Sequence, residues 1–251
     1  MKKLMTAALM TTLLSGCVIH VGHSKEANIT YEDHLALSSS GITTLIIDNG
    51  AGDIIVKGDE LTDEINVDAY IRTDNKEKIE FSLERRGTKA YLIGSYQSGI
   101  NMWNGNSPSV DLTISMPDNI AVVIDDGSGD VFMSEIKSDV TIDDGSGSID
   151  LKNIKGNITI EDGSGSIDIN NIIGNIDVED GSGNISVDEV TGKVVIDDNS
   201  GSISVTNTGD TVVIEDGSGD ILVKNTKGLT ILDDGSGDLD IINIDGKVSI
   251  D

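Results

Sequence analysis

The apolar and polar residues between positions 110 and 251 repeat with an 18-residue period. Each repeat contains two stretches in which Ile, Val or Leu alternates with polar residues, a pattern typical of strands with one buried face. The sequence Asp-Gly-Ser-Gly, with Asn for the first Gly in one copy, marks one turn of every repeat. A unit this short cannot bury its own apolar face, so the repeats are expected to stack. The sequence thus predicts an all-β fold, a parallel β-helix (β-solenoid) with 18-residue coils and two short strands per coil.

The inward columns follow from counting forward from the Asp of each turn. The fifth and seventh places are aliphatic or Met in every coil, and the fourteenth and sixteenth, such as Ile158 and Ile160, supply the second inward strand. The fifteenth place, which includes Ile231, is expected to face outward. Asn199 replaces the first Gly of one turn, and Asn tolerates positive φ better than other non-glycine residues. A left-handed backbone is therefore expected at this place in every coil.

The regular repeats occupy residues 110–251, and residues 41–109 depart from their period. Residues 45–56 repeat the theme with Ala for Ser and are expected to form a first coil. Longer strands follow, with a turn at Arg85-Arg86-Gly87, so we expect an irregular N-terminal β excursion, a hairpin that covers the end of the stack. Its six basic side chains form either a solvated hairpin or a docking patch. They are Arg72, Lys76, Lys78, Arg85, Arg86 and Lys89.

The first 17 residues are typical of an exported lipoprotein. Two lysines precede an apolar run that is too short to span a bilayer, which indicates a signal peptide over residues 1–16. The ending Leu-Ser-Gly-Cys resembles the lipobox of bacterial lipoproteins, whose cysteine becomes lipidated. Cys17 is the only cysteine, so it has no disulfide partner, and lipidation accounts for it. Because Val18 rather than Asp follows the cysteine, the resemblance implies that this lipid anchors the protein to the outer membrane, and it leaves open which face of the membrane carries the protein. Residues 17–40 are expected to form a linker between the lipid and the folded part.

The chain is strongly acidic, with 44 Asp and Glu against 17 Lys and Arg and a net charge of −27. Removal of the signal peptide takes away two lysines and leaves −29. Such a surface repels nucleic acid and anionic lipid head groups. Cations and basic groups of other molecules remain as partners.

Two acids precede each turn, and stacking would align them in two columns of like charge. Adjacent coils lie about 4.8 Å apart, where two unit charges repel by about 0.9 kcal/mol in water and about 3.5 kcal/mol at an effective dielectric of 20. Two ways to offset this repulsion stay open: backbone N–H groups that bind each Asp in an Asx-turn, or bound calcium as the one cofactor considered. The speculative metal ligands are Asp126, Asp144, Asp162, Asp180, Asp198, Asp216 and Asp234.

No enzyme is indicated. A nucleophile with its base, a metal triad or paired carboxylates on a cleft would interrupt the repeat, and the repeats contain no such departure. Gly-Ser-Gly lacks the lysine and the following helix of a phosphate-binding loop. His20 and His23 have no carboxylate or thiol cluster nearby, so a solvated linker is the better reading than a metal site.

Three features together resemble the putative-adhesin family of bacterial envelope β-solenoids. They are the early coil at residues 45–56, the strand Val110–Pro117 before the regular array, and the repeated Gly-Ser-Gly units. The resemblance covers residues 41–251 and implies a parallel β-helix and a role in adhesion or envelope-stress sensing, without catalytic residues. We therefore expect a lipid-anchored envelope module that presents an acidic rod to a protein or glycan partner. A calcium-binding or cation-buffering protein is the alternative, and end-to-end self-association through the last coil is a further expectation.

Overall fold

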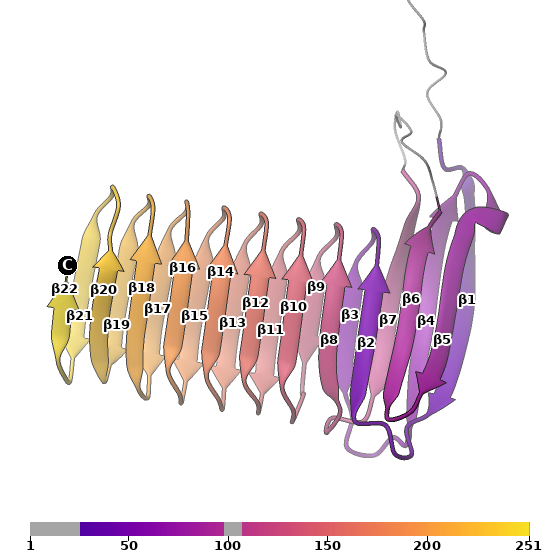
Figure 1. Cartoon of the computed structure of the whole chain (residues 1–251), viewed down its shortest axis with the longest axis horizontal. Coiled ribbons are helices and arrows are strands. Elements are labelled where there is room, and N and C mark those ends of the chain that lie inside the picture. Colours follow the sequence, from indigo (N-terminus) through magenta and orange to yellow (C-terminus); the bar gives the residue numbers. More distant parts are fainter. Residues whose placement is uncertain (1–25, 98–106, 251) are drawn as a thin grey trace, which may run out of the picture.

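The computed structural model describes residues 26–97 and 107–250. Their strands form two 11-stranded sheets that face each other along a rod (Figure 1). Ile, Val and Leu side chains from both sheets meet between them in one continuous core. This arrangement confirms the predicted β-solenoid. None of the helices in the described ranges has the length and apolar character needed to cross a membrane.

The two sheets have similar strand orders. The first sheet consists, in spatial order, of β1 (Ile29–Ser38), β4 (Glu64–Thr73), β7 (Ser109–Met116), β3 (Ile54–Gly58), β9 (Val131–Ser134), β11 (Ile149–Ile154), β13 (Ile167–Ile172), β15 (Ile185–Val190), β17 (Ile203–Thr208), β19 (Ile221–Thr226) and β21 (Leu239–Ile244). The second sheet, in front in Figure 1, consists of β22 (Val248–Ile250), β20 (Gly228–Asp233), β18 (Thr211–Asp216), β16 (Val194–Asp198), β14 (Ile176–Asp180), β12 (Ile158–Asp162), β10 (Val140–Asp144), β8 (Ala121–Asp126), β2 (Thr44–Asn49), β6 (Lys89–Tyr96) and β5 (Ile79–Arg86). A short 3-10 helix, η1 (Lys76–Lys78), precedes β5.

The regular coils stack in parallel register. Ile142 pairs with Ile160 in the second sheet, and Ile149 pairs with Ile167 in the first. Each pair is separated by one full period of the sequence, which confirms the predicted coil length. Equivalent residues of successive coils therefore form straight columns along the rod, and the alternation of each strand decides whether a column is buried or exposed.

One coil departs from this register. Ile214 pairs with Ile231, one position short of a full period, whereas Glu215 pairs with Asp233, at the full period. Leu232 is the extra residue of the resulting bulge. The prediction that Ile231 faces outward is wrong, because the shift buries Ile231 completely and leaves Leu232 47% exposed.

The N-terminal strands are interleaved with later ones. β2 lies between β6 and β8, and β3 lies between β7 and β9. The coil formed by β2 and β3 is thus the earliest in sequence but lies inside the stack, and the chain leaves it, builds the end of the rod and returns past it. The predicted hairpin at the end of the stack is present as the antiparallel pair β5 and β6, which Gly87 joins with a φ of +68°.

The predicted linker over residues 17–40 is too long. Within it, Ile29–Ser38 forms β1, which pairs antiparallel with β4 along its whole length. The reason is burial, since Tyr31, Leu35 and Leu37 pack against the core and help to close its end together with Phe81 and Leu83 of β5. His34 therefore belongs to a strand, where its Nδ1 lies 2.9 Å from the Asp68 carboxylate.

The turns bring consecutive coils into backbone contact at the second glycine. Gly165 has a φ of +151°, and a Cβ atom there would lie 1.5 Å from the carbonyl oxygen of Gly147, so only glycine fits. The prediction of a left-handed backbone directly after the turn Asp is wrong for Asn199. Positive φ angles occur instead at the second glycine of six turns and at the ninth place of the coil, and only in the seventh turn does the residue after the turn Asp, Gly235, have the predicted positive φ, of +50°.

Candidate functional site

The two acids before each turn face opposite sides of their strand. In β10, Ile142 is buried, Asp143 is exposed and Asp144 is buried again, as strand alternation requires. The same pattern recurs in the neighbouring coils, so the acids form an inner column and an outer column. The inner column consists of Asp126, Asp144, Asp162, Asp180, Asp198 and Asp216, each at most 6% exposed. The outer column consists of Asp125, Asp143, Glu161, Glu179, Asp197 and Glu215.

Each inner Asp from Asp144 onward caps its own turn. The backbone N–H of Ser146 donates to Oδ1 of Asp144 at 3.0 Å, and that of Ser164 donates to Oδ1 of Asp162 at 3.1 Å. Asp180, Asp198 and Asp216 make the equivalent contact at 2.9 to 3.0 Å. The Asx-turn, one of the two ways to offset the repulsion that the sequence left open, is therefore confirmed in five coils.

The second carboxylate oxygen of the inner Asp residues is unpartnered. The Oδ2 atoms of all six inner Asp residues are buried without a hydrogen-bond partner in the described part of the chain. Burial, with repulsion from carboxylates of adjacent coils, raises the pKa of Asp126 to about 7 and the pKa values of Asp162 and Asp198 to about 6. Burial also raises the pKa values of the other three. The inner column is thus costly to ionise.

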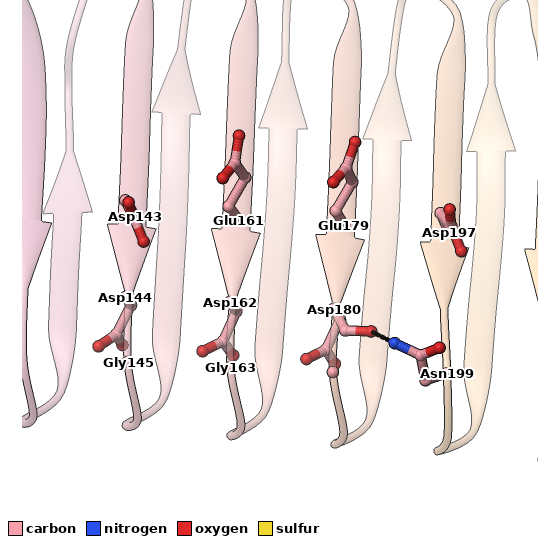
Figure 2. A pocket seen from close by; sticks show the side chains of 11 residues that line it. Asp143, Asp144, Gly145, Glu161, Asp162, Gly163, Glu179, Asp180, Asp197 and Asn199 are labelled. Atoms are coloured by element: carbon pink, nitrogen blue, oxygen red, sulfur yellow. Dashed lines mark hydrogen bonds between the residues drawn. The ribbon is translucent and has the colours of Figure 1, made fainter.

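The outer column borders a groove. A groove of about 520 Å³ runs across four coils of the second sheet, between the outer acids and the turns. Figure 2 shows how Asp143, Glu161, Glu179 and Asp197 project from the ends of successive strands. Asn199 reaches back to the preceding coil, where its Nδ2 donates to the carbonyl oxygen of Asp180 at 3.4 Å. The lining repeats one chemistry, carboxylates beside glycine backbone, from coil to coil.

The described residues contain no group of three His, Cys, Asp or Glu side chains placed to hold a metal ion. Calcium at the seven turn Asp residues, the speculative alternative to turn capping, stays an untested hypothesis. Asp234, the seventh, differs from the other six because the bulge at Leu232 precedes it. It is half-buried, and the turn N–H of Gly235 donates to Oδ1 of Asp233 instead, at 2.9 Å.

An asparagine ladder on the opposite corner was not predicted. The residue at the ninth place has a φ of 55 to 61° in seven coils. Asn171 Nδ2 donates to Asn153 Oδ1 at 2.6 Å, and Asn243 Nδ2 donates to Asn225 Oδ1 at 2.7 Å. Asn at this place in five of seven repeats was the available signal, because Asn accepts the left-handed backbone and ladders across parallel strands.

The basic residues of the N-terminal excursion contact aromatic rings. Lys76 Nζ lies 4.0 Å from the ring centroid of Tyr31, and the Arg86 guanidinium lies 4.9 Å from that of Tyr91. Arg85 donates to the carbonyl oxygen of Ser40 at 2.7 Å. These contacts favour a structural role for the cluster over a docking patch.

Several predicted features lie outside the described residues. These are the signal peptide, the lipidation site Cys17, and His20 and His23. The lipid anchor and the outer-membrane location are therefore not tested by the geometry.

The sequence matches a known family over most of its length. The sequence profile of the family described as Toastrack DUF4097 matches residues 33–250. The chain belongs to the Toastrack DUF4097 family. The match includes the interleaved N-terminal strands as well as the regular coils.

A solved structure supports the Toastrack fold. A crystal structure of a putative adhesin from Bacteroides fragilis has a TM-score of 0.53 at 14% identity, and the alignment covers 89% of this chain and 98% of that one. A putative lipid binding protein from Parabacteroides distasonis is also similar, with a TM-score of 0.43, 14% identity, and coverage of 90% and 98%. Among curated proteins, none matches this sequence. The resemblance to a putative-adhesin family is confirmed.

Proposed function

We propose that the protein is a lipid-anchored, adhesin-like module of the cell envelope, which presents its outer acid column to a protein or glycan partner. The observation that carries this proposal is the register of the column, which sets six carboxylates in line, four of them along one groove. Evenly spaced like charges on a rigid sheet favour a partner with several basic groups. The adhesin name of the similar structure from Bacteroides fragilis agrees with a binding role.

The role is non-catalytic in this proposal. Catalysis requires different groups at defined positions around one reacting atom. The groove instead repeats the same carboxylate and glycine environment in three coils, with Asn199 in place of the glycine in the fourth. Such uniformity suits multivalent attachment, in which many weak contacts add along the rod.

The anchor would place the rod at the membrane. Replacement of Cys17 by Ser removes the predicted lipid site, and we expect the protein to move to the soluble fraction or to stay unprocessed. Recovery of Cys17→Ser in the membrane fraction at wild-type size and amount would contradict lipid anchoring while leaving the binding role open.

The partner class can be tested with defined probes. The mature Cys17→Ser chain is immobilised and exposed to polylysine and to chitosan, a cationic glycan, at low and physiological salt. We expect binding to weaken at least tenfold in a variant that neutralises part of the column. This outer variant carries Asp143→Asn, Glu161→Gln and Glu179→Gln.

A matched control removes three carboxylates from the outer face of the first sheet, with Asp150→Asn, Asp168→Asn and Asp240→Asn. Its net charge equals that of the outer variant, so it should retain binding if the column itself is recognised. Equal loss in both variants would mean that only net charge matters. Unchanged binding in the outer variant would reject the column as the contact surface.

A further inference from the structure

We propose that the inner Asp column is a proton-binding site, in which carboxyl groups of adjacent coils share hydrogen bonds once they are protonated. Acid would then tighten the rod. This inference is independent of the partner proposed above, because it concerns the interior of the coils.

The geometry supplies one vacant carboxylate oxygen in each coil from Asp144 to Asp216, and two at Asp126. Each Oδ1 from Asp144 to Asp216 already accepts a serine N–H, whereas each Oδ2 is buried without a partner among the described residues. A carboxylate cannot donate, so two neighbouring carboxylates can only repel each other. A proton taken from solvent onto one Oδ2 creates an O–H donor that can bond to the carboxylate of the next coil, about 4.8 Å along the rod.

The charged groups around the column all disfavour ionisation. Those that act on it are the neighbouring inner acids, Asp130, the outer acids Asp143 and Asp197, and, near the last coils, Asp233 and Asp234. No basic side chain of the described residues contributes to these shifts. The inward residues of the facing sheet are aliphatic or Met. They are Val131, Met133, Ile149, Leu151, Ile167, Ile169, Ile185, Val187, Ile203, Val205, Ile221 and Val223.

One coil already carries a neutral member. Asn49 of β2 pairs in register with Asp126 and occupies the same buried place. Its Nδ2 donates to the carbonyl oxygen of Gly52 at 3.0 Å. The column therefore accepts an uncharged side chain of the same shape, which is the state that protonation gives to each Asp.

The direction of the pH effect follows from the raised pKa values. The folded protein binds protons with pKa values of about 6 to 7 at Asp126, Asp162 and Asp198, against 3.8 for an unperturbed Asp. The folded state thus holds more protons than the unfolded state between about pH 4 and pH 7. Stability should rise as pH falls through 7 and 6, and it should be lost as pH rises through the same range.

Melting temperatures of three proteins test the proposal: the mature chain, an inner variant (Asp126→Asn, Asp162→Asn, Asp198→Asn) and the outer variant defined above. From pH 7.5 to pH 5 the melting temperature of the mature chain and of the outer variant should rise by about 10 °C. The inner variant should lose at least half of this rise and melt above the mature chain at pH 7.5.

A fall or no change in the melting temperature of the mature chain on acidification would overturn the proposal, as would an inner variant that keeps the full rise. If the inner variant does not fold, carboxyl carbon NMR of the mature chain decides: inner Asp signals that titrate above pH 5.5 support proton binding, and titration of all Asp signals below pH 5 rejects it. As a last test, the melting temperatures of the mature chain and the inner variant are measured at pH 7.5 with and without millimolar calcium. A calcium-induced rise equal to that of acid, absent from the inner variant, would make the column a cation site instead.

Discussion

Asp162 and Glu161 are adjacent in β12, yet their carboxylates lie in opposite environments. Both residues line the same groove, but Glu161 is exposed, whereas Asp162 is 6% exposed and accepts a hydrogen bond from the Ser164 N–H of the turn. Their charges are the same, and their neighbours along the rod are again acids. The difference teaches that strand alternation, rather than residue type, assigns one acid to the surface and the other to the interior.

The comparison also explains which substitutions the repeat tolerates. The outer column contains both Asp and Glu, but all six members of the inner column are Asp. Only the short Asp side chain can reach the N–H two residues ahead in an Asx-turn. The outer acid has no such geometric requirement, so its length can vary.

Deletions that keep or break the columns should have the largest effect. Removal of residues 145–162 takes out one whole coil and keeps both columns aligned, so a folded, shorter rod is expected. Removal of residues 145–153 joins a strand to the wrong turn, and the protein should not fold. Circular dichroism and thermal melting compare the two deletions, and equal melting temperatures would contradict the stacking register.

The same substitution at adjacent positions should separate the columns. Asp162→Lys places an unpaired charge in the core and should lower the free energy of unfolding by about 5 kcal/mol. Glu161→Lys lies on the surface between like charges and should change the melting temperature by about 3 °C or less. Chemical denaturation measures both variants. Similar losses in the two would show that the outer acid is not merely a surface group.

The turn that supports both columns depends on its second glycine. Gly165→Ala should cost about 4 kcal/mol, because the added Cβ meets the Gly147 carbonyl oxygen and φ is +151°. Gly87→Ala is the control, since φ is +68° there and no atom lies within 4 Å of the added Cβ. It should cost about 1 kcal/mol from backbone strain alone. Equal losses of stability in the two variants would mean that glycine is required at position 165 for its φ angle alone, and not for the close contact between coils.

Exchange of the two acids should give the smallest effect. Asp162→Glu adds a methylene group to a packed interior and lengthens the reach to Ser164, so a loss of about 2 kcal/mol is expected. Glu161→Asp should be nearly neutral, since Asp occurs in the outer column of other coils. A neutral Asp162→Glu variant would show that the Asx-turn contributes little to stability.

The regular coils were predictable because their information is local. Period, turn and alternation recur in every repeat, so the coil length, the inward columns and the Asp caps followed from the sequence. The exceptions needed global information. The loop before β20 is one residue shorter than in the other coils, and the extra residue Leu232 within β20 restores the period. The spacing from Asp216 to Asp234 is therefore unchanged, which conceals the shift in the sequence.

The N-terminal strands and the state of the acids were beyond the local pattern. The position of β2 between β6 and β8 depends on pairing between segments far apart in sequence, which no local alternation specifies. Residues 29–38 alternate weakly, and only the packing of Tyr31, Leu35 and Leu37 against the core reveals β1. The sequence placed two acids at each turn, but the unpartnered Oδ2 atoms appear only when burial and hydrogen bonds are known.

The interleaved coil has a consequence for how the rod resists force. A pull on the N-terminal side first peels β1 from β4, its one hydrogen-bonded neighbour in the described sheets. Extraction must then withdraw β2 and β3 from between strands on both sides, which breaks two ladders of hydrogen bonds in each sheet at once. Among the described strands, β21 and β22 at the far end of the stack each have one hydrogen-bonded neighbour, so that coil peels from one coil only. The rod should therefore unravel from its C-terminal coils under load, while its N-terminal end acts as a locked joint.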